Sequence, residues 1–130
     1  MENRYGFGKS VAMGFDEAIA NVTAELQKEG FGILTEIDVA ATMKKKLDFN
    51  MPRYRILGAC NPPLAKRAIT ADPTIGLLLP CNVVVREDAE RLVHVEFLDP
   101  RMMGQMTDKA DIAALGNEVR EKLRRVMDAL

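Results

Sequence analysis

The spacing of apolar residues changes several times along this chain of 130 residues, and those changes limit the folds open to it. Two segments, residues 15–29 and 112–130, place apolar side chains three or four residues apart, as one face of a helix does. Other segments alternate apolar and polar residues or are rich in β-branched ones, which is typical of strands. The clearest of these are residues 54–60, 82–85 and 91–98. The chain is therefore expected to combine helices with a sheet.

Two shorter helices are predicted from the residues that precede them. Asp38 has the side chain of a helix N-cap and comes before a short amphipathic segment, residues 39–47. The side chains expected to face inward there are Val39, Met43 and Leu47. Asn61 is a second predicted cap, followed by a helix over residues 62–71 that begins with proline, whose missing N–H costs nothing in the first turn.

Residues 4–11 and 31–37 complete the predicted strands. The polar turn at residues 87–90 joins two strands into a hairpin, so the sheet cannot be purely parallel. We expect one α+β domain over residues 1–130. Its form is a two-layer sandwich with a mixed, mostly antiparallel sheet of about five strands and helices packed on one face. The uncovered face would suit a homodimer interface if its side chains are apolar.

The pattern is less decisive in two places. Residues 75–79 are apolar throughout, and their spacing does not decide between helix and strand. A methionine-rich connection with Met102, Met103 and Met106 leads to the last helix, for which Thr107 or Asp108 is the expected cap.

Composition excludes several functions. The 18 basic and 19 acidic residues give a net charge of −1, without the positive excess that generic nucleic-acid binding requires. No apolar run reaches the ~18 residues of a membrane span, and the first residues do not resemble a signal peptide, so a cytoplasmic protein is expected. Two cysteines are too few for a disulfide scaffold and are expected to be free thiols.

The two cysteines form the most informative motif. Cys60 precedes Asn61 and Cys81 precedes Asn82, each pair beside a proline at a predicted strand end. Cys60 also stands just before a helix, whose N-terminal dipole would lower a thiol pKa and favour a reactive thiolate. The alternative is that both thiols pack in the core, where free cysteines are common. If the two lie on adjacent strands, they are either a redox pair or core neighbours.

Other motifs carry less weight. Residues 6–10 end like a phosphate-binding loop, but the required first glycine is missing, and a strand with close glycine contacts is the better interpretation. The lysine run at residues 44–46 fits a solvated helix face better than an anion site. His94 shares a strand face with Glu96, and with Cys60 and Cys81 it would complete a metal-ligand set of unusual spacing.

The sequence resembles a bacterial and archaeal family called domain of unknown function 302. The segments that carry the resemblance are YRILGACNPPLA at residues 54–65, LLLPCNV at 77–83 and EGFGILTEID at 29–38. The resemblance implies a small two-layer α+β domain that forms dimers, and it implies no activity. The family pattern singles out Asp38, Lys46, Tyr54, Cys60, Asn61, Pro62, Pro80, Cys81 and Asp99.

Capping does not explain Lys46 or the cysteines, so we expect Lys46 to meet Cys60 in a pocket and depress its pKa. The preferred function is a homodimeric protein that holds a small anionic or thiol-reactive ligand around the thiols. The ligand-binding candidates are Cys60, Cys81, Lys46, Asp38, Tyr54, Asn61 and Asn82. One alternative is a thiol enzyme or redox protein using Cys60 activated by Lys46. Another is a structural or interaction module with buried cysteines. No cofactor follows from the sequence.

Overall fold

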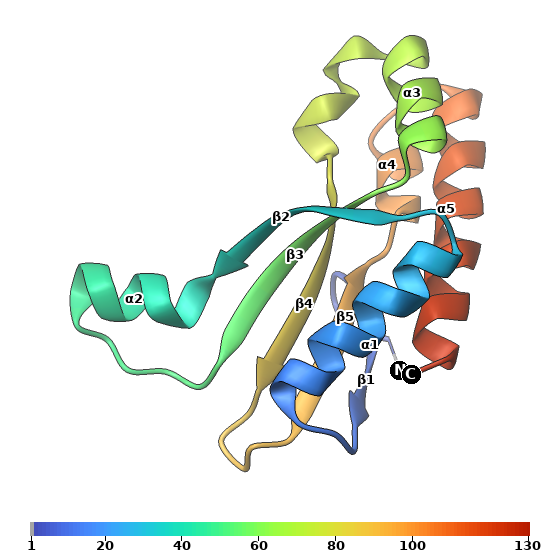
Figure 1. Cartoon of the computed structure of the whole chain (residues 1–130). Helices are drawn as coiled ribbons and strands as arrows, with labels where there is room; N and C mark the ends of the chain where they lie inside the picture. Colours follow the sequence, from blue (N-terminus) through green and yellow to red (C-terminus); the bar gives the residue numbers. More distant parts are fainter. Residues whose placement is uncertain (1) are drawn as a thin grey trace.

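The computed structural model describes residues 2–130, in which helices cover one face of a five-stranded sheet (Figure 1). In chain order the strands are β1 (Gly6–Val11), β2 (Gly32–Asp38), β3 (Tyr54–Cys60), β4 (Cys81–Glu87) and β5 (Val93–Leu98). The α-helices are α1 (Phe15–Lys28), α2 (Val39–Leu47), α3 (Pro62–Ala71), α4 (Arg101–Gln105) and α5 (Ala110–Asp128). A 3-10 helix, η1 (Pro73–Leu78), precedes β4.

The strand order across the sheet is β1-β5-β4-β3-β2. All four pairings between these strands are antiparallel. The predicted two-layer α+β fold is therefore confirmed, and its mostly antiparallel sheet is antiparallel in every pairing of the described residues. The first strand of the chain pairs with the last, while β3 and β4 lie in the interior of the sheet.

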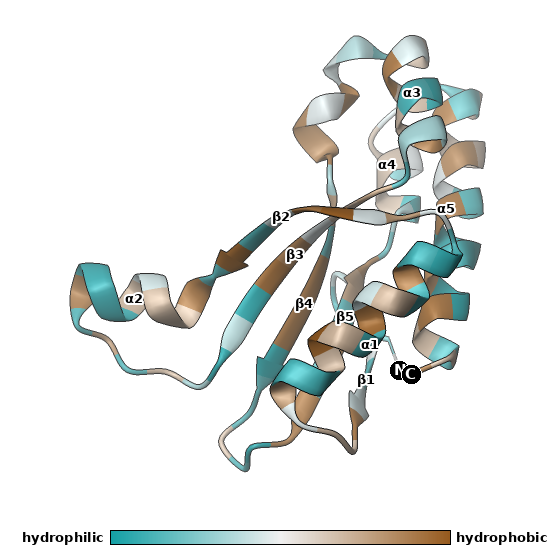
Figure 2. Ribbon diagram, in the orientation of Figure 1, coloured by the Kyte–Doolittle hydropathy of each residue, from teal (hydrophilic) through white to brown (hydrophobic). Residues whose placement is uncertain are grey.

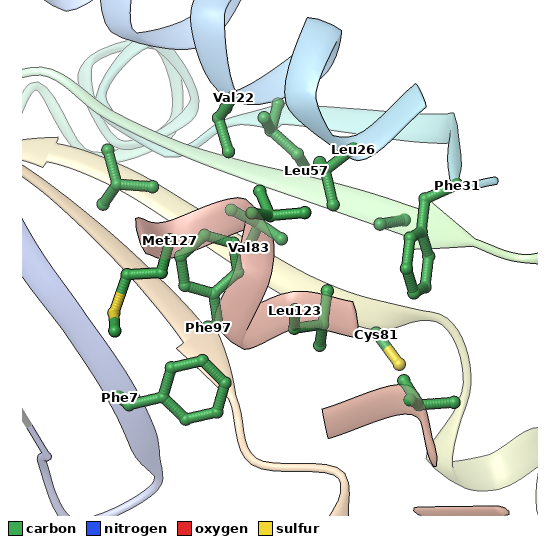
Figure 3. Close-up of a cluster of buried hydrophobic side chains, with 14 of the residues drawn as sticks. Phe7, Val22, Leu26, Phe31, Leu57, Cys81, Val83, Phe97, Leu123 and Met127 are labelled. Atoms are coloured by element: carbon green, nitrogen blue, oxygen red, sulfur yellow. The ribbon is translucent and has the colours of Figure 1, made fainter. Parts of the chain in front are cut away.

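The core lies between the sheet and helices α1 and α5 (Figure 3). Along β5 buried residues alternate with half-buried ones, as expected of a sheet covered on one face. The rings of Phe7 and Phe97 stack with their centroids 5.7 Å apart. Figure 2 shows hydrophobic and hydrophilic residues alternating around α1 and α5, the two helices for which the sequence predicts an apolar stripe. Those stripes are buried, so the pattern correctly indicated which face of each helix packs into the core.

Helix α2 departs from the prediction. Its bounds and its Asp38 cap are as expected, with the Ala41 backbone N–H donating to the Asp38 carboxylate at 2.9 Å. However, α2 extends away from the rest of the molecule and contains no buried residue (Figure 1). Val39 and Met43 are half-buried, whereas Leu47 is 71% exposed, so the predicted inward orientation is wrong for Leu47. Helical spacing defines an apolar face but does not supply the partner that covers it.

The regions that the sequence left open contain two short helices. The undecided segment at residues 75–79 lies largely within η1, and the methionine-rich connection contains α4, where Met103 is buried. The last helix begins at Ala110, with Lys109 at its cap position and no side-chain cap. Neither Thr107 nor Asp108 caps it, because the helix begins one or two residues later than expected.

The glycines of β1 are packing glycines, as the sequence indicated. A Cβ atom at Gly6 would come within 2.9 Å of the Asp99 backbone nitrogen and still closer to the Phe97 carbonyl oxygen. A larger residue would therefore push β1 away from β5. Across residues 2–130, no helix is long and apolar enough to cross a membrane.

Candidate functional site

A cavity of about 320 Å³ lies at the end of the sheet where β3 ends and β4 begins. Its walls come from these strand ends and from α3, η1, α4 and α5. The residues that line it include Ala59, Cys60, Asn61, Ala65, Cys81 and Met103. Exposed side chains of Leu34 and Ile69 also line it, so the cavity reaches the surface.

The structure brings the two cysteines to this cavity. Cys81 is opposite Ala59 in the β3–β4 register, and Cys60 is the next residue along β3. Both are free thiols, Cys60 half-buried and Cys81 buried. Figure 3 shows Cys81 at the margin of the cluster of buried hydrophobic side chains. The cysteines are therefore neighbours across two adjacent strands that line one cavity.

The environment of Cys81 favours its neutral form. Burial, followed by the nearby Cys60, raises the pKa of the Cys81 thiol from 9.0 to about 11. A protonated thiol is a poor nucleophile, because the thiolate is the reactive species. At neutral pH Cys81 therefore acts as a small, weakly polar wall group.

Asn61 fixes the wall that α3 contributes. Its side-chain oxygen accepts a hydrogen bond from the Leu64 backbone N–H at 3.4 Å, which confirms the predicted cap. Its amide nitrogen donates to the backbone carbonyl oxygen of Glu29 at 3.1 Å. Both ends of this buried side chain are occupied within the protein, so Asn61 positions the cavity wall.

Gly58 permits the close packing beside the thiols. A Cβ atom at this position would lie 2.8 Å from Cγ of Pro80 and nearer still to the hydroxyl oxygen of Thr35. The Leu79–Pro80 peptide bond is cis, and Pro80 lines the cavity directly before Cys81. Glycine at position 58 therefore allows β2, β3 and the Pro80 ring to meet.

Lys46 is not brought to Cys60. The β2–β3 register pairs Asp38 with Arg55, so α2 starts beside the first residues of β3, whereas Cys60 is its last residue. At about 3.4 Å per residue, Arg55 and Cys60 lie roughly 17 Å apart along the strand. Lys46 is exposed on α2, which extends away from the sheet (Figure 1). The predicted meeting of Lys46 and Cys60 is therefore wrong.

Three other ligand-binding candidates lie outside the cavity. Asp38 caps α2, and a guanidinium nitrogen of Arg55 lies 3.5 Å from its carboxylate. Tyr54 is opposite Arg86 at the far end of β3 from the thiols. Asn82 is exposed and lines a neighbouring groove, not the cavity. Of the seven candidates, the structure gathers Cys60, Asn61 and Cys81 around the cavity.

His94 is also separated from the thiols. It is opposite Arg86 on β4, and its Nε2 atom is 2.9 Å from an Asp88 carboxylate oxygen. Cys81 is at the other end of the same strand. The candidate ligand set of Cys60, Cys81 and His94 is therefore not assembled. Within residues 2–130, no group of three or more His, Cys, Asp or Glu side chains is placed to hold a metal ion.

Sequence reasoning missed most of the cavity wall. Leu115 and Val119 were assigned to the core stripe of the last helix, and Met103 to a connection, yet all three line the cavity. Apolar spacing shows that a residue faces inward. It does not show whether the space in front of that residue is filled.

Comparison with known proteins agrees with this architecture. The family model described as "Domain of unknown function DUF302" matches residues 7–130. The chain is similar to an uncharacterized conserved protein, DUF302, from Bacillus stearothermophilus, whose crystal structure gives a TM-score of 0.89 at 26% sequence identity and 98% coverage of both chains. No functionally curated protein matches the chain. The resemblance expected from the cysteine motifs is confirmed, and the chain belongs to the DUF302 family.

Proposed function

We propose that this domain binds a small, uncharged and mainly apolar molecule in the cavity around Cys60 and Cys81. The observation that carries this proposal is the cavity itself, about 320 Å³ in volume and lined by apolar side chains, two thiols and Asn61. Ligand sites are typically concave, mainly apolar and roughly 300–1,000 Å³ in volume. No Asp, Glu, Lys, Arg or His is among the described lining residues, and an unpaired charge is costly to bury. An anionic ligand is therefore disfavoured.

The same lining favours binding over thiol catalysis. Beyond a helix N-terminus, such as the one that follows Cys60, a cysteine nucleophile relies on a neighbouring base or cation that stabilises its thiolate. The described cavity lining supplies neither a base nor a cation. Lys46, the activator expected from the sequence, is on α2, which starts beside the end of β3 opposite to Cys60. In this proposal Cys60 contacts the ligand as a polarisable wall group, and Asn61 keeps α3 in position.

A fluorescent dye tests the proposal. Nile red is uncharged and brightens when it leaves water for an apolar site. We expect saturable binding to the reduced protein, and loss of at least about tenfold in affinity, or 1.4 kcal/mol, in Ala65→Phe, which fills the cavity. The matched control is Ala24→Phe, on the exposed face of α1.

Two results would overturn the proposal: no saturable binding by the parent, or equal binding by Ala65→Phe and the parent. Either would favour the structural module with core thiols. Circular dichroism checks that each variant is folded, and Ala65→Leu offers a smaller filling side chain if phenylalanine prevents folding.

We also propose that the domain acts as a homodimer through its open sheet face and α2. The uncovered face carries an apolar row that follows the strand register through Ile37, Ile56 and Val84. Helix α2 has nine residues and none is buried, whereas isolated helices shorter than about 12 residues are marginal in water. A second copy would cover both surfaces.

Charge complementarity supports a second copy as the partner. Helix α2 carries the basic run Lys44, Lys45 and Lys46, and the end of β4 and the turn that follows it carry Glu87, Asp88 and Glu90. In a two-fold dimer each basic helix can meet the partner's acidic turn, so the favourable contact occurs twice.

Light scattering tests this assembly. The expected mass is twice 14.4 kDa for the parent and 14.4 kDa for Leu47→Glu, which places a charge on the exposed apolar end of α2. Leu77→Glu is the control, because Leu77 is exposed on η1 and remote from α2. A monomeric parent at micromolar concentration would contradict the proposal.

We further place the protein in the cytoplasm. The two free thiols support this assignment, because a reducing compartment keeps cysteines from pairing. Cell fractionation with antibody detection tests it, and recovery of the protein in an extracytoplasmic fraction would refute it.

A further inference from the structure

A second groove, of about 260 Å³, borders the ligand cavity on the side of η1 and α4. The two spaces share Cys81 and Met103 as wall residues. The groove is also lined by Met102 and Met106. One thiol and three thioethers therefore line a single depression that the proposed ligand-binding function does not use.

Core packing explains Met103 but not Met102 or Met106. Met103 is buried, but Met102 is 36% exposed and Met106 is 67% exposed. Met106 follows Met102 by four positions and Met103 by three, which places all three on one side of the α4 segment. All three methionines therefore border the groove, and Met102 and Met106 remain exposed there.

We propose that this groove binds a monovalent soft metal ion, Cu(I), with Cys81 as thiolate ligand and the surrounding methionines as thioether ligands. Thiolate and thioether sulfur select Cu(I), whereas Mg²⁺ and Ca²⁺ prefer oxygen ligands. The carboxylate of Asp99, which also lines the groove, is occupied by Arg101 at 2.7 Å and Arg120 at 3.2 Å. Asn82 also lines the groove, but its amide oxygen is a hard ligand, so the soft ligands that the groove offers are sulfur atoms.

The binding step is balanced without a change in oxidation state. The Cys81 S–H bond breaks, a Cu–S bond forms, and the proton leaves to solvent. The thiolate carries one negative charge and Cu(I) one positive charge, so the complex with neutral thioethers has no net charge. That neutrality suits a partly buried, largely apolar site, where an unpaired ion would be costly.

An anaerobic competition titration tests the site. Reduced, metal-free protein is mixed with Cu(I) and the chromophoric chelator bicinchoninate, and copper transfer is read from absorbance. We expect one equivalent bound. Cys81→Ala and the double variant Met102→Leu/Met106→Leu should each lower the affinity by at least about tenfold. Leucine keeps the apolar volume, and both methionines are exposed, so the double variant should fold.

Two matched controls separate this site from others. Met51→Leu alters a methionine outside the groove, and Cys60→Ala removes the thiol that lines only the cavity. Both should bind Cu(I) within about twofold of the parent. Absence of Cu(I) binding, or binding that needs Cys60 but neither Met102 nor Met106, would overturn the proposal. Nile red binding by the double variant reports on the cavity separately, so failure of one proposal does not imply failure of the other.

Discussion

The side-chain amide of Asn61 donates a hydrogen bond of 3.1 Å to the backbone carbonyl oxygen of Glu29, joining the start of α3 to the end of α1. Gly30 makes this approach possible, because it adopts a φ of +86° and a Cβ atom there would lie 2.9 Å from the Asn61 amide nitrogen. The opposite end of the same side chain caps α3. One asparagine thus links a helix of the core to a wall of the cavity.

Replacing Asn61 should distinguish the contributions of its two hydrogen bonds to stability. Asn61→Ala loses both and is expected to lower the free energy of unfolding by about 2 kcal/mol. Asn61→Ser keeps a capping acceptor but no longer reaches Glu29, so its stability should be intermediate. Urea denaturation followed by circular dichroism measures the order. An alanine variant as stable as the parent would show that neither bond contributes.

Gly58→Ala should destabilise the cavity end of the sheet by about 1–3 kcal/mol, because the new methyl group would overlap Thr35 and Pro80. Gly32→Ala is the control, since a Cβ atom there meets nothing within 4 Å. Adding Thr35→Ala to Gly58→Ala should recover part of the loss, a coupling that a double-mutant cycle detects. Thermal unfolding measures the parent, Gly58→Ala, Thr35→Ala, the double variant and the control Gly32→Ala. Equal melting temperatures for Gly58→Ala and Gly32→Ala would contradict the packing argument.

The raised pKa of Cys81 predicts alkaline instability of the metal-free protein. In the unfolded chain the thiol loses its proton near 9.0, whereas in the folded chain it does so only near 11. The contribution of the protonated Cys81 thiol to stability is therefore fully present below pH 9 and is lost as the pH rises towards 11. The loss amounts to about 3 kcal/mol.

Cys81→Ala should remove this alkaline component, although it lowers stability at pH 7 by deleting a buried group. Urea midpoints between pH 8 and pH 11 measure the effect. If the parent and Cys81→Ala decline in parallel over that range, titration of Cys81 is not the cause. Cys60→Ser serves as a second comparison, since it keeps Cys81 in place.

Asp99 should make the folded protein less stable as the pH falls, whereas Cys81 makes it less stable as the pH rises. Burial acts to raise the pKa of its carboxyl group, but hydrogen bonds from Arg101 and Arg120 outweigh burial and hold the pKa below 3.8. A lowered folded-state pKa gives stability that is present above pH 3.8 and is lost as the pH falls below it. Asp99→Asn should therefore cost about 1–2 kcal/mol at pH 7.

The gap between parent and Asp99→Asn should narrow as the pH falls below 4. Denaturation midpoints at pH 7, 5, 4 and 3 measure this convergence. If the stability difference between the parent and Asp99→Asn is the same at every pH, it comes from altered packing, and the charge of Asp99 does not contribute.

Local features were readily predicted from the sequence. The caps Asp38 and Asn61 depend on residues within one helical turn, and both are confirmed. The apolar stripes of α1 and α5 were also recognised correctly, because their spacing matches the helix period over several turns.

Features that depend on distant parts of the chain were harder to predict. Cys60 and Cys81 are neighbours because of the β3–β4 register. The sequence alone left open whether they lie on adjacent strands. Lys46 was misplaced because the direction in which α2 leaves the sheet is a tertiary property. The cavity itself depends on how four helical segments leave space between them, and residue periodicity carries no information on unfilled volume.

The pairing of β1 with β5 has a consequence for the order in which the fold assembles. Gly6 pairs with Leu98, so most of the chain must be closed into a loop before this edge forms, whereas β4 and β5 are joined by a short turn. Closing a longer loop costs more conformational entropy, and contacts between residues far apart in sequence slow folding. The β3–β4–β5 meander should therefore form before β1 joins it. Since β1 contributes nothing to the cavity lining, transient release of this edge would expose its amides to hydrogen exchange while leaving the two thiols in place.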